Sequence, residues 1–454
     1  MVSSLILAAV LSATSGPAAT PELQAWLSEV RSRARLPGLA VVVITAAGEV
    51  SSVTLGTDAE GAEVGPRSVF AIGSLSKSFT ALGVMILVER GKLSLDQPAA
   101  ALLPELDPRI SIRHLLHHTS GIPGAAGFWF DGGSLEGRVR ALHGEPLLWA
   151  PGTAFQYSNA NYDALGLIIE RVTGKPYARF MRDEVLGPMG LDQVWVRAEL
   201  AEVPRGYQDW FGVYQARRDS DDWTEANTPS GGMFATAEGM GAVLRLHLTE
   251  GRSLEPTVLS EAGFGTLHRA GTDEDSSYAM GWTVRQLDGQ PMIVHSGQTG
   301  EFTSTMALFP RSGFAVAALA NVNALASPAT RLAVRDIVPG VAQLVLGKSP
   351  KTSTWFGYRN QPAMKWLFLG IGLVSLARFA WAWRRGQSRP RWHAAFDGAL
   401  AVALLVGVPW LAHIPLVAML RFNPDLAVLL MVGAVASVVR GGSTVLTKRA
   451  TPAS

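Results

Sequence analysis

The segment that decides the fold reads Phe-Ala-Ile-Gly-Ser-Leu-Ser-Lys over residues 70–77, and an apolar helical pattern follows it as far as Arg90. Ser74 and Lys77 stand three residues apart, which places both side chains on one face of a helix. A serine hydroxyl is a poor nucleophile until a base takes its proton. A lysine amine acts as that base only when burial or positive neighbours lower its pKa. The pattern predicts Ser74 as nucleophile and Lys77 as its proton-transfer partner, although Ser-x-x-Lys alone is also common on solvated helix surfaces.

A second motif, Phe-Gln-Tyr-Ser-Asn at residues 155–159, directly precedes another helical pattern. The phenol of Tyr157 can relay a proton, and the amide of Asn159 can hold a substrate carbonyl. Taken alone, the motif is equally compatible with a tyrosine packed in a loop and an asparagine in a turn.

A third motif, His295-Ser296-Gly297, ends an apolar strand-like run. Glycine at such a position lets a substrate backbone approach the strand edge. The next N–H, that of Gln298, can join the N–H of Ser74 as an oxyanion hole, and such a donor contributes about 3–4 kcal/mol to the transition state. For His295 by itself, a structural role is the simpler interpretation.

Apolar periodicity predicts an α+β fold. Strand patterns near the two ends of the domain predict one antiparallel sheet assembled from both ends, flanked by helices, with a mainly helical subdomain between them. The expected helices are 22–34, 74–90, 161–173 and 327–346, and the expected strands are 39–44, 50–55, 292–295, 303–309 and 314–320. We expect one domain over residues 21–346 and a linker over 347–362.

The three motifs in this order resemble the serine β-lactamase and penicillin-binding-protein superfamily, over roughly residues 22–345. The nearest branch holds class C β-lactamases, D-aminopeptidases, DD-carboxypeptidases and related esterases. Further similar stretches are His117–Gly121, Tyr157–Tyr162, Gly231–Thr236, Met280–Trp282 and Phe302–Asn321.

The resemblance implies a β-lactamase/transpeptidase-like α/β sandwich and acylation of Ser74. It implies that Lys77 and Tyr157 together act as general base and acid, and it leaves open which of them takes the serine proton. It further implies that Asn159 holds the substrate's acyl-side amide and that residues 295–298 line the site.

One departure bears on the substrate. Many members of that superfamily have Lys-Thr-Gly where this chain has His295-Ser296-Gly297. A lysine there is a fixed cation facing a substrate carboxylate, whereas histidine is mostly neutral at pH 7. Esters, D-amino-acid amides and peptides are therefore favoured as substrates over efficient hydrolysis of β-lactams. The departure also keeps a rival hypothesis open, namely a catalytically weak domain that binds peptidoglycan or peptides or regulates a membrane partner.

The charge distribution predicts a soluble domain followed by a membrane region. Residues 364–454 carry ten Lys and Arg against two Asp and Glu, a net charge of +8, which leaves −6 on residues 1–363. We expect transmembrane helices at 363–383, 398–420 and 424–440 within a membrane domain over 363–454, because 398–420 is free of charge for 23 residues, enough to cross a ~30 Å hydrocarbon core.

Residues 1–20 are expected to be a signal peptide, with an apolar arm as the alternative. The basic C-terminal tail orients the catalytic domain to the extracytoplasmic side, so the expected localisation is the membrane and the expected partners are a small-molecule or peptide substrate and membrane lipid.

Composition excludes several classes of site. The chain has no cysteine, so thiolate nucleophiles and cysteine-based metal sites are excluded. His114, His117 and His118 lie together without an acidic partner at metal spacing, and we interpret them as a helix end near the site. We expect neither metal nor cofactor, and no nucleic-acid binding, because the acidic domain lacks a basic face.

Overall fold

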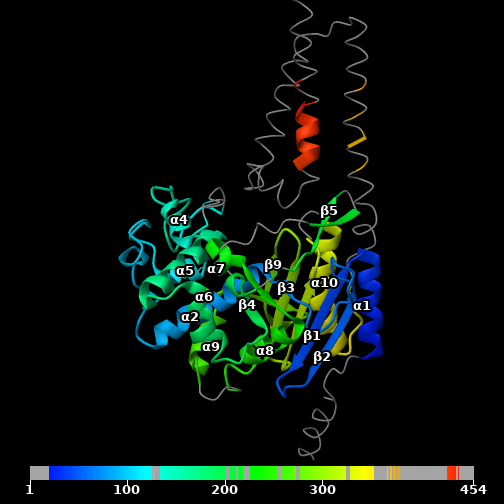
Figure 1. Cartoon of the computed structure of the whole chain (residues 1–454). Helices are drawn as coiled ribbons and strands as arrows, with labels where there is room; N and C mark the ends of the chain where they lie inside the picture. Colours follow the sequence, from blue (N-terminus) through cyan, green and yellow to red (C-terminus); the bar gives the residue numbers. More distant parts are fainter. Residues whose placement is uncertain are drawn as a thin grey trace, which may run out of the picture.

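The computed structural model describes residues 20–351 except 125, 127–132, 201, 203, 211–212, 218–224, 253–256, 272–276 and 324–327, together with residues 366, 369–370, 373, 377, 427–435 and 438. A six-stranded antiparallel sheet forms the centre of the domain, in the order β2-β1-β11-β10-β9-β8 (Figure 1). Its strands are β1 (Gly38–Thr45), β2 (Val50–Gly56), β8 (Thr283–Leu287), β9 (Gln290–Gln298), β10 (Thr303–Phe309) and β11 (Phe314–Ala320). The N-terminal hairpin joins strands from the other end of the domain through β1 and β11, as the sequence predicted.

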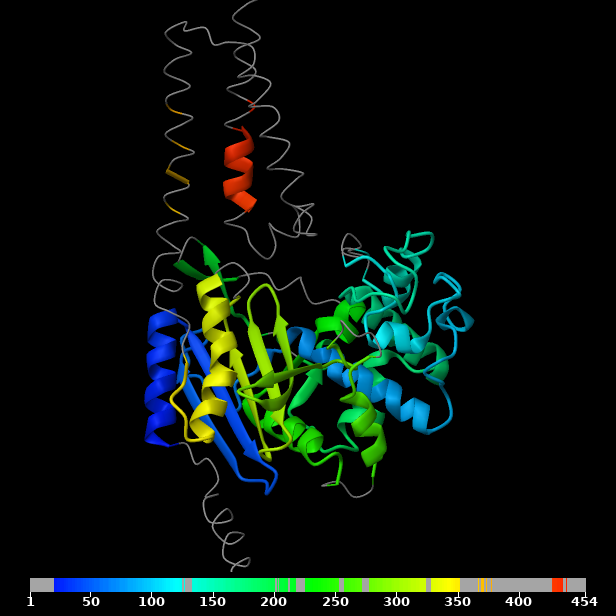
Figure 2. The same ribbon diagram turned by 180° about the vertical axis from the view of Figure 1, so that it is seen from behind.

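Side-chain alternation along β1 explains why both faces of the sheet are covered. Leu39, Val41 and Val43 pack against α1 (Pro21–Ala34) and α10 (Pro328–Val345), which lie side by side on one face (Figure 2). Ala40, Val42 and Ile44 point to the opposite face, toward α8 (Ala237–Leu248). Since successive side chains of a strand point to opposite faces, a central strand with helices on both sides must be apolar throughout, and this one is.

A helical region adjoins one end of the sheet. Its core is α2 (Ser76–Glu89), which is apolar nearly all round and buried over most of its length, as expected of a helix surrounded by others. The remaining helices are α3 (Ile112–Leu116), α4 (Leu135–Arg140), α5 (Asn159–Thr173), α6 (Tyr177–Phe180), α7 (Thr228–Gly231) and α9 (Glu261–Leu267), with short helical turns at Gly73–Leu75, Ala99–Ala101, Met181–Leu186, Arg197–Glu199 and Glu225–Asn227.

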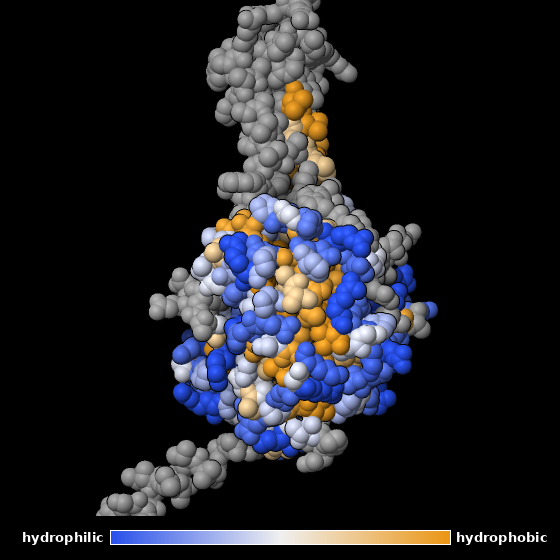
Figure 3. All heavy atoms as spheres, turned by 90° about the vertical axis from the view of Figure 1, so that its left-hand side faces the viewer, coloured by the Kyte–Doolittle hydropathy of each residue, from blue (hydrophilic) through white to orange (hydrophobic). Residues whose placement is uncertain are grey.

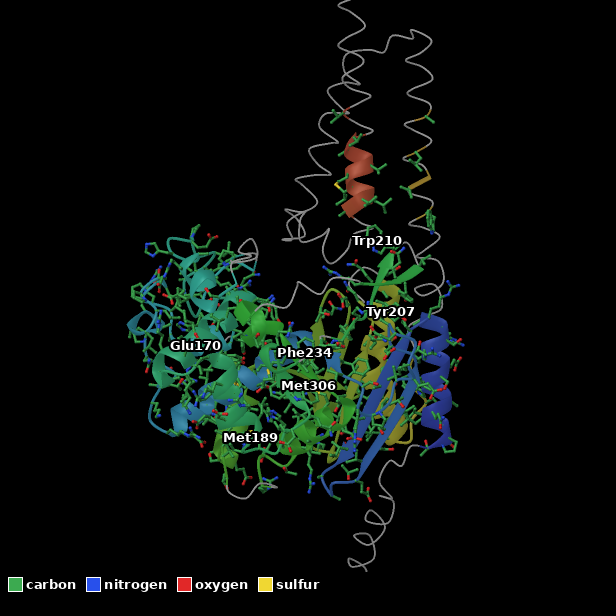
Figure 4. All side chains as sticks on the ribbon, viewed as in Figure 1. Glu170, Met189, Tyr207, Trp210, Phe234 and Met306 are labelled. Carbon is green, nitrogen blue, oxygen red and sulfur yellow. The ribbon has the colours of Figure 1, made fainter. Side chains whose placement is uncertain are left out.

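A small three-stranded sheet, β3-β7-β4, connects the two regions. Its strands are β3 (Phe70–Ala71), β4 (Val194–Val196) and β7 (Met233–Ala235). Phe234 of β7 and Met306 of β10 lie at the centre of the molecule between the large sheet and the helices (Figure 4), and both are fully buried. A separate hairpin pairs β5 (Tyr207–Trp210) with β6 (Val213–Ala216). End-on to the helical region, apolar residues form a band across a mostly hydrophilic surface (Figure 3).

The expected α+β fold is confirmed, with differences at the element ends. Ser74 belongs to a short 3₁₀ turn, Gly73–Leu75, in front of α2, and α5 begins at Asn159, two residues earlier than predicted. No helix among the described residues combines the length and apolarity that a membrane crossing requires. The expected signal peptide over 1–20 and the expected spans 363–383, 398–420 and 424–440 lie largely outside the described residues.

Candidate active site

The backbone around Ser74 is held by contacts that leave little freedom. Gly73 has φ +53°, and a Cβ there would lie 2.6 Å from the backbone nitrogen of Gln298, so only glycine fits without strain. The hydroxyl of Ser76 donates to the Gly73 carbonyl (2.7 Å) and accepts from the N–H of Met233 in β7 (3.0 Å). The turn that carries Ser74 is therefore fixed to both sheets.

Lys77 lies beside Ser74, as the i, i+3 spacing predicts. Its side chain is fully buried. The Nζ atom lies 3.2 Å from Ser74 Oγ, 2.8 Å from Asn159 Oδ1 and 2.6 Å from the backbone oxygen of Ser230. The structure thus brings together Ser74, Lys77 and Asn159 from two separate motifs, and it adds Ser230 of α7, which the sequence analysis did not identify.

The electrostatic surroundings of Lys77 suit a base. Burial lowers its pKa to about 7, against an opposing effect of the Asp163 carboxylate. Asp163 is itself buried and accepts from Arg138 Nε at 3.0 Å. Burial raises the pKa of Asp163, and Arg138 opposes that rise. A lysine with a pKa near neutrality is unprotonated about half of the time at pH 7.

Tyr157 lies close to both Lys77 and Ser74. Its ring centroid is 4.8 Å from Lys77 Nζ. Burial raises the pKa of its phenol, and a side-chain hydrogen bond with Ser74 opposes the rise. The phenol is thus protonated at neutral pH, and the Ser74 hydroxyl contacts both an amine and a phenol.

His118 supports the ring of Tyr157. It follows α3, and its ring centroid is 4.4 Å from that of Tyr157 and 4.7 Å from that of Tyr278. Its Nδ1 accepts from Asn161 Nδ2 at 3.0 Å, and burial lowers its pKa well below the usual value. His118 is therefore a neutral ring in the wall of the site, consistent with a helix end packed nearby.

His295 is held as a neutral imidazole by two hydrogen bonds. Its Nδ1 donates to the Ser296 carbonyl (2.9 Å), so its Nε2 accepts from the Tyr278 hydroxyl (3.0 Å). Burial lowers the pKa of His295 to about 3. Its position therefore carries no cation at physiological pH. The Ser296 carbonyl sets this tautomer, and Tyr278, which hydrogen-bonds to Nε2, was not identified from the sequence.

The outer edge of β9 is available at the site. In the described part of the chain the ladder with β8 covers residues 290–294 of β9 and ends before His295. Ser296 is exposed, whereas Gly297 is buried against Ile72. A Cβ at position 297 would overlap the backbone oxygen of Ile72. The Gln298 nitrogen lies against Gly73, one residue before the nucleophile, a proximity that an oxyanion hole shared between the N–H groups of Gln298 and Ser74 requires.

Comparisons with known proteins agree with this arrangement. Residues 23–338 match the family model described as beta-lactamase. Penicillin-binding protein 4 of Amycolatopsis lactamdurans is 30% identical over 317 residues, which cover 64% of this chain and 82% of that protein. Protein flp of Staphylococcus aureus (strain MW2) is 26% identical over 273 residues, 57% of this chain, and the match spans only about half (54%) of flp.

Solved structures show the same fold. The octameric penicillin-binding protein homologue from Pyrococcus abyssi superposes with a TM-score of 0.64 at 24% identity, covering 76% of this chain and 81% of that one. D-amino acid amidase from Ochrobactrum anthropi SV3 gives a TM-score of 0.56 at 23% identity, over 66% of this chain and 90% of the amidase. The match of the family model over most of the domain carries the assignment: the chain belongs to the beta-lactamase family, within the superfamily of serine β-lactamases and penicillin-binding proteins.

Proposed function

We propose that this protein is a serine hydrolase that acts through an acyl-enzyme on Ser74. One observation carries the proposal: the buried amine of Lys77, with its pKa lowered to about 7, lies 3.2 Å from the Ser74 hydroxyl. A neutral amine in that position can take the serine proton, which is the step that a free serine lacks.

In acylation, Ser74 Oγ attacks the substrate carbonyl carbon while its proton passes to Lys77, either directly or through Tyr157. The N–H groups of Ser74 and Gln298 stabilise the resulting oxyanion. The tetrahedral intermediate collapses, the bond to the leaving group breaks, and the leaving group takes the proton from the same pair of residues. Water then attacks the carbonyl carbon of the ester and gives its proton to Lys77 and Tyr157. The bond to Ser74 Oγ breaks, Oγ takes that proton, and the acid and free Ser74 result.

The side chains around Ser74 favour substrates without a carboxylate next to the scissile bond. His295 is neutral, so this position offers no fixed charge to such a group. Phe155 is 39% exposed, and its ring lies 5.7 Å from that of Tyr278, which adds an apolar surface beside the site. We therefore propose esters and D-amino-acid amides or peptides with apolar acyl groups as preferred substrates, ahead of β-lactam-like compounds.

We propose, in addition, that the C-terminal region anchors the enzyme to a membrane with the catalytic domain on the extracytoplasmic side. The charge-free stretch 398–420 and the excess of ten basic over two acidic residues in 364–454 support this proposal, since both are typical of membrane proteins. Protease treatment of intact cells should remove the domain while leaving the C-terminal fragment in the membrane. Recovery of the whole chain in the soluble fraction would refute the anchoring.

A fluorophosphonate probe tests the mechanism. The full-length chain should be labelled on Ser74, as mapped by mass spectrometry, and Ser74→Ala should abolish both labelling and ester turnover. Ser28→Ala, a change on the exposed side of α1, is the matched control and should retain both. Labelling at another residue, or ester turnover that Ser74→Ala leaves intact, would contradict the proposal and favour the rival role as a non-catalytic binding domain.

A further inference from the structure

A pocket lies between α3 and the end of α9, apart from the catalytic residues. Its volume is about 270 Å³, and its lining includes Arg113, His114, His117, Thr119 and Arg269. Among the residues that the structure describes, no Asp or Glu lines it, and neither do Ser74, Lys77 and Tyr157. Since a water molecule takes about 30 Å³ in the liquid, the pocket has room for a ligand of several heavy atoms.

Arginine and histidine side chains supply most of the polar groups that line this pocket. His114 Nδ1 accepts from the Ser111 N–H at 3.2 Å, the ring also forms a hydrogen bond with the backbone of Arg109, and its second nitrogen is Nε2. A Cβ at Gly152 would lie 3.1 Å from that Nε2. The glycine therefore leaves this edge of the His114 ring uncovered on the side of the pocket.

The two arginines differ in how far they are already neutralised. Arg113 binds Asp96 through Nε (2.7 Å) and a second nitrogen (3.0 Å). Arg269 is exposed, and among the described residues it has no ionic or hydrogen-bonded side-chain partner. The described lining holds two guanidinium groups and two imidazoles but no acid, and Arg269 forms no ion pair with any described residue. Such a lining is complementary to a negatively charged group.

We propose that this pocket binds a small anion, through a carboxylate or phosphate group held by Arg269 and His114. The proposal is independent of hydrolysis, because none of the residues assigned to acyl transfer lines the pocket. It nevertheless connects to the active site. His117 Nδ1 donates to the Tyr278 carbonyl at 3.1 Å, and the Tyr278 hydroxyl bonds to His295.

Calorimetric titration of the full-length chain with two probes tests the proposal. Inorganic phosphate represents a tetrahedral oxoanion and N-acetylglycine a carboxylate, so the stronger binder identifies the preferred group. Arg269→Gln should weaken the stronger probe about fivefold, and raising the salt concentration should weaken it further. Arg285→Gln, at an exposed arginine on β8, is the matched control and should leave the affinity unchanged.

Two outcomes would overturn the proposal. The first is that neither probe binds at millimolar concentration. The second is that Arg269→Gln and Arg285→Gln weaken binding equally, as expected of general surface charge. Because Arg269 is exposed, its variant should keep the far-ultraviolet circular dichroism and melting temperature of the wild type. A lost affinity therefore reports on the pocket and not on folding.

Discussion

The pH dependence of acylation follows from the pKa of Lys77. With a pKa of about 7, the amine is neutral in about one molecule in eleven at pH 6, about half at pH 7 and nearly all at pH 9. With an ordinary lysine pKa, only about one in 3000 would be neutral at pH 7. We therefore expect kcat/KM for an ester to rise about tenfold from pH 6 to a plateau above pH 8, with its midpoint near pH 7.

Removal of the Asp163 charge tests the origin of that midpoint. The carboxylate stabilises the protonated amine, so it raises the pKa of Lys77 against the larger effect of burial. In Asp163→Asn that support is lost, and Arg138 remains as an unpaired cation. Both changes disfavour the ammonium form, so the midpoint should move to lower pH. Asp107→Asn removes a partly exposed carboxylate that also pairs with an arginine, and it should leave the midpoint unchanged.

The assay is the initial rate with a fluorogenic ester between pH 5 and 9, in a constant-ionic-strength buffer, with folding checked at each pH by circular dichroism. Lys77→Arg provides the limiting case, because a guanidinium does not lose its proton in this range, and its kcat should fall at least about 100-fold. A wild-type midpoint near pH 10, or an upward shift in Asp163→Asn, would refute the assignment of Lys77 as the group that must be neutral.

Four further changes test the site and its support. Tyr157→Phe should lower kcat by about 100-fold or more with little effect on KM in steady-state assays; an unchanged kcat would remove the phenol from the proton route. His295→Lys should raise the ratio of β-lactam to neutral-ester turnover, and a ratio that falls would contradict the role given to charge at that position. Gly297→Ala should lower both activity and the urea midpoint of unfolding, since its Cβ would overlap the Ile72 oxygen; wild-type values would show that the strand has room to shift. Burial lowers the pKa of His268 to about 4, so between about pH 6.5 and 4 the unfolded chain binds a proton there and the folded chain does not. The free energy of unfolding should therefore fall as the pH is lowered from 6.5 to 4. His268→Gln should make that decline smaller in urea titrations.

The strands of the large sheet other than β8 were predictable because their patterns are long. Residues 303–309 and 314–320 have the bounds expected from sequence. The second is a continuous apolar run, the first ends in the apolar run Met306–Phe309, and turn residues lie between them. In contrast, β3, β4 and β7 contain two or three residues each, which is too short for any period to show. β8 reads Thr-Val-Arg-Gln-Leu and has no buried residue, so it lacks the apolar alternation that would have marked it as a strand.

The same distinction applies to the site. The spacing within each motif predicted that Ser74 lies near Lys77, whereas the proximity of Tyr157 and Asn159 to that pair was expected only from the resemblance to the superfamily. The contact of Lys77 with Ser230 could not, because it uses a backbone oxygen, which every residue has. Asp163 did leave a signal: it lies four residues after Asn159 on α5, and residues at that spacing share a helix face.

The contacts of Lys77 also determine where its lone pair points. Its ammonium form has three N–H groups, and three acceptors surround it: Asn159 Oδ1, the Ser230 carbonyl and Ser74 Oγ. The neutral amine keeps two N–H groups and gains a lone pair. A carbonyl oxygen has no proton to offer, so the two N–H groups remain directed at Asn159 and Ser230. Among the three partners only the Ser74 hydroxyl can donate, and deprotonation of Lys77 therefore aims its lone pair at the proton that acylation must remove. On this argument Asn159 orients the base in the free enzyme, and a substrate amide that engages Asn159 must do so without displacing Lys77 from its oxygen.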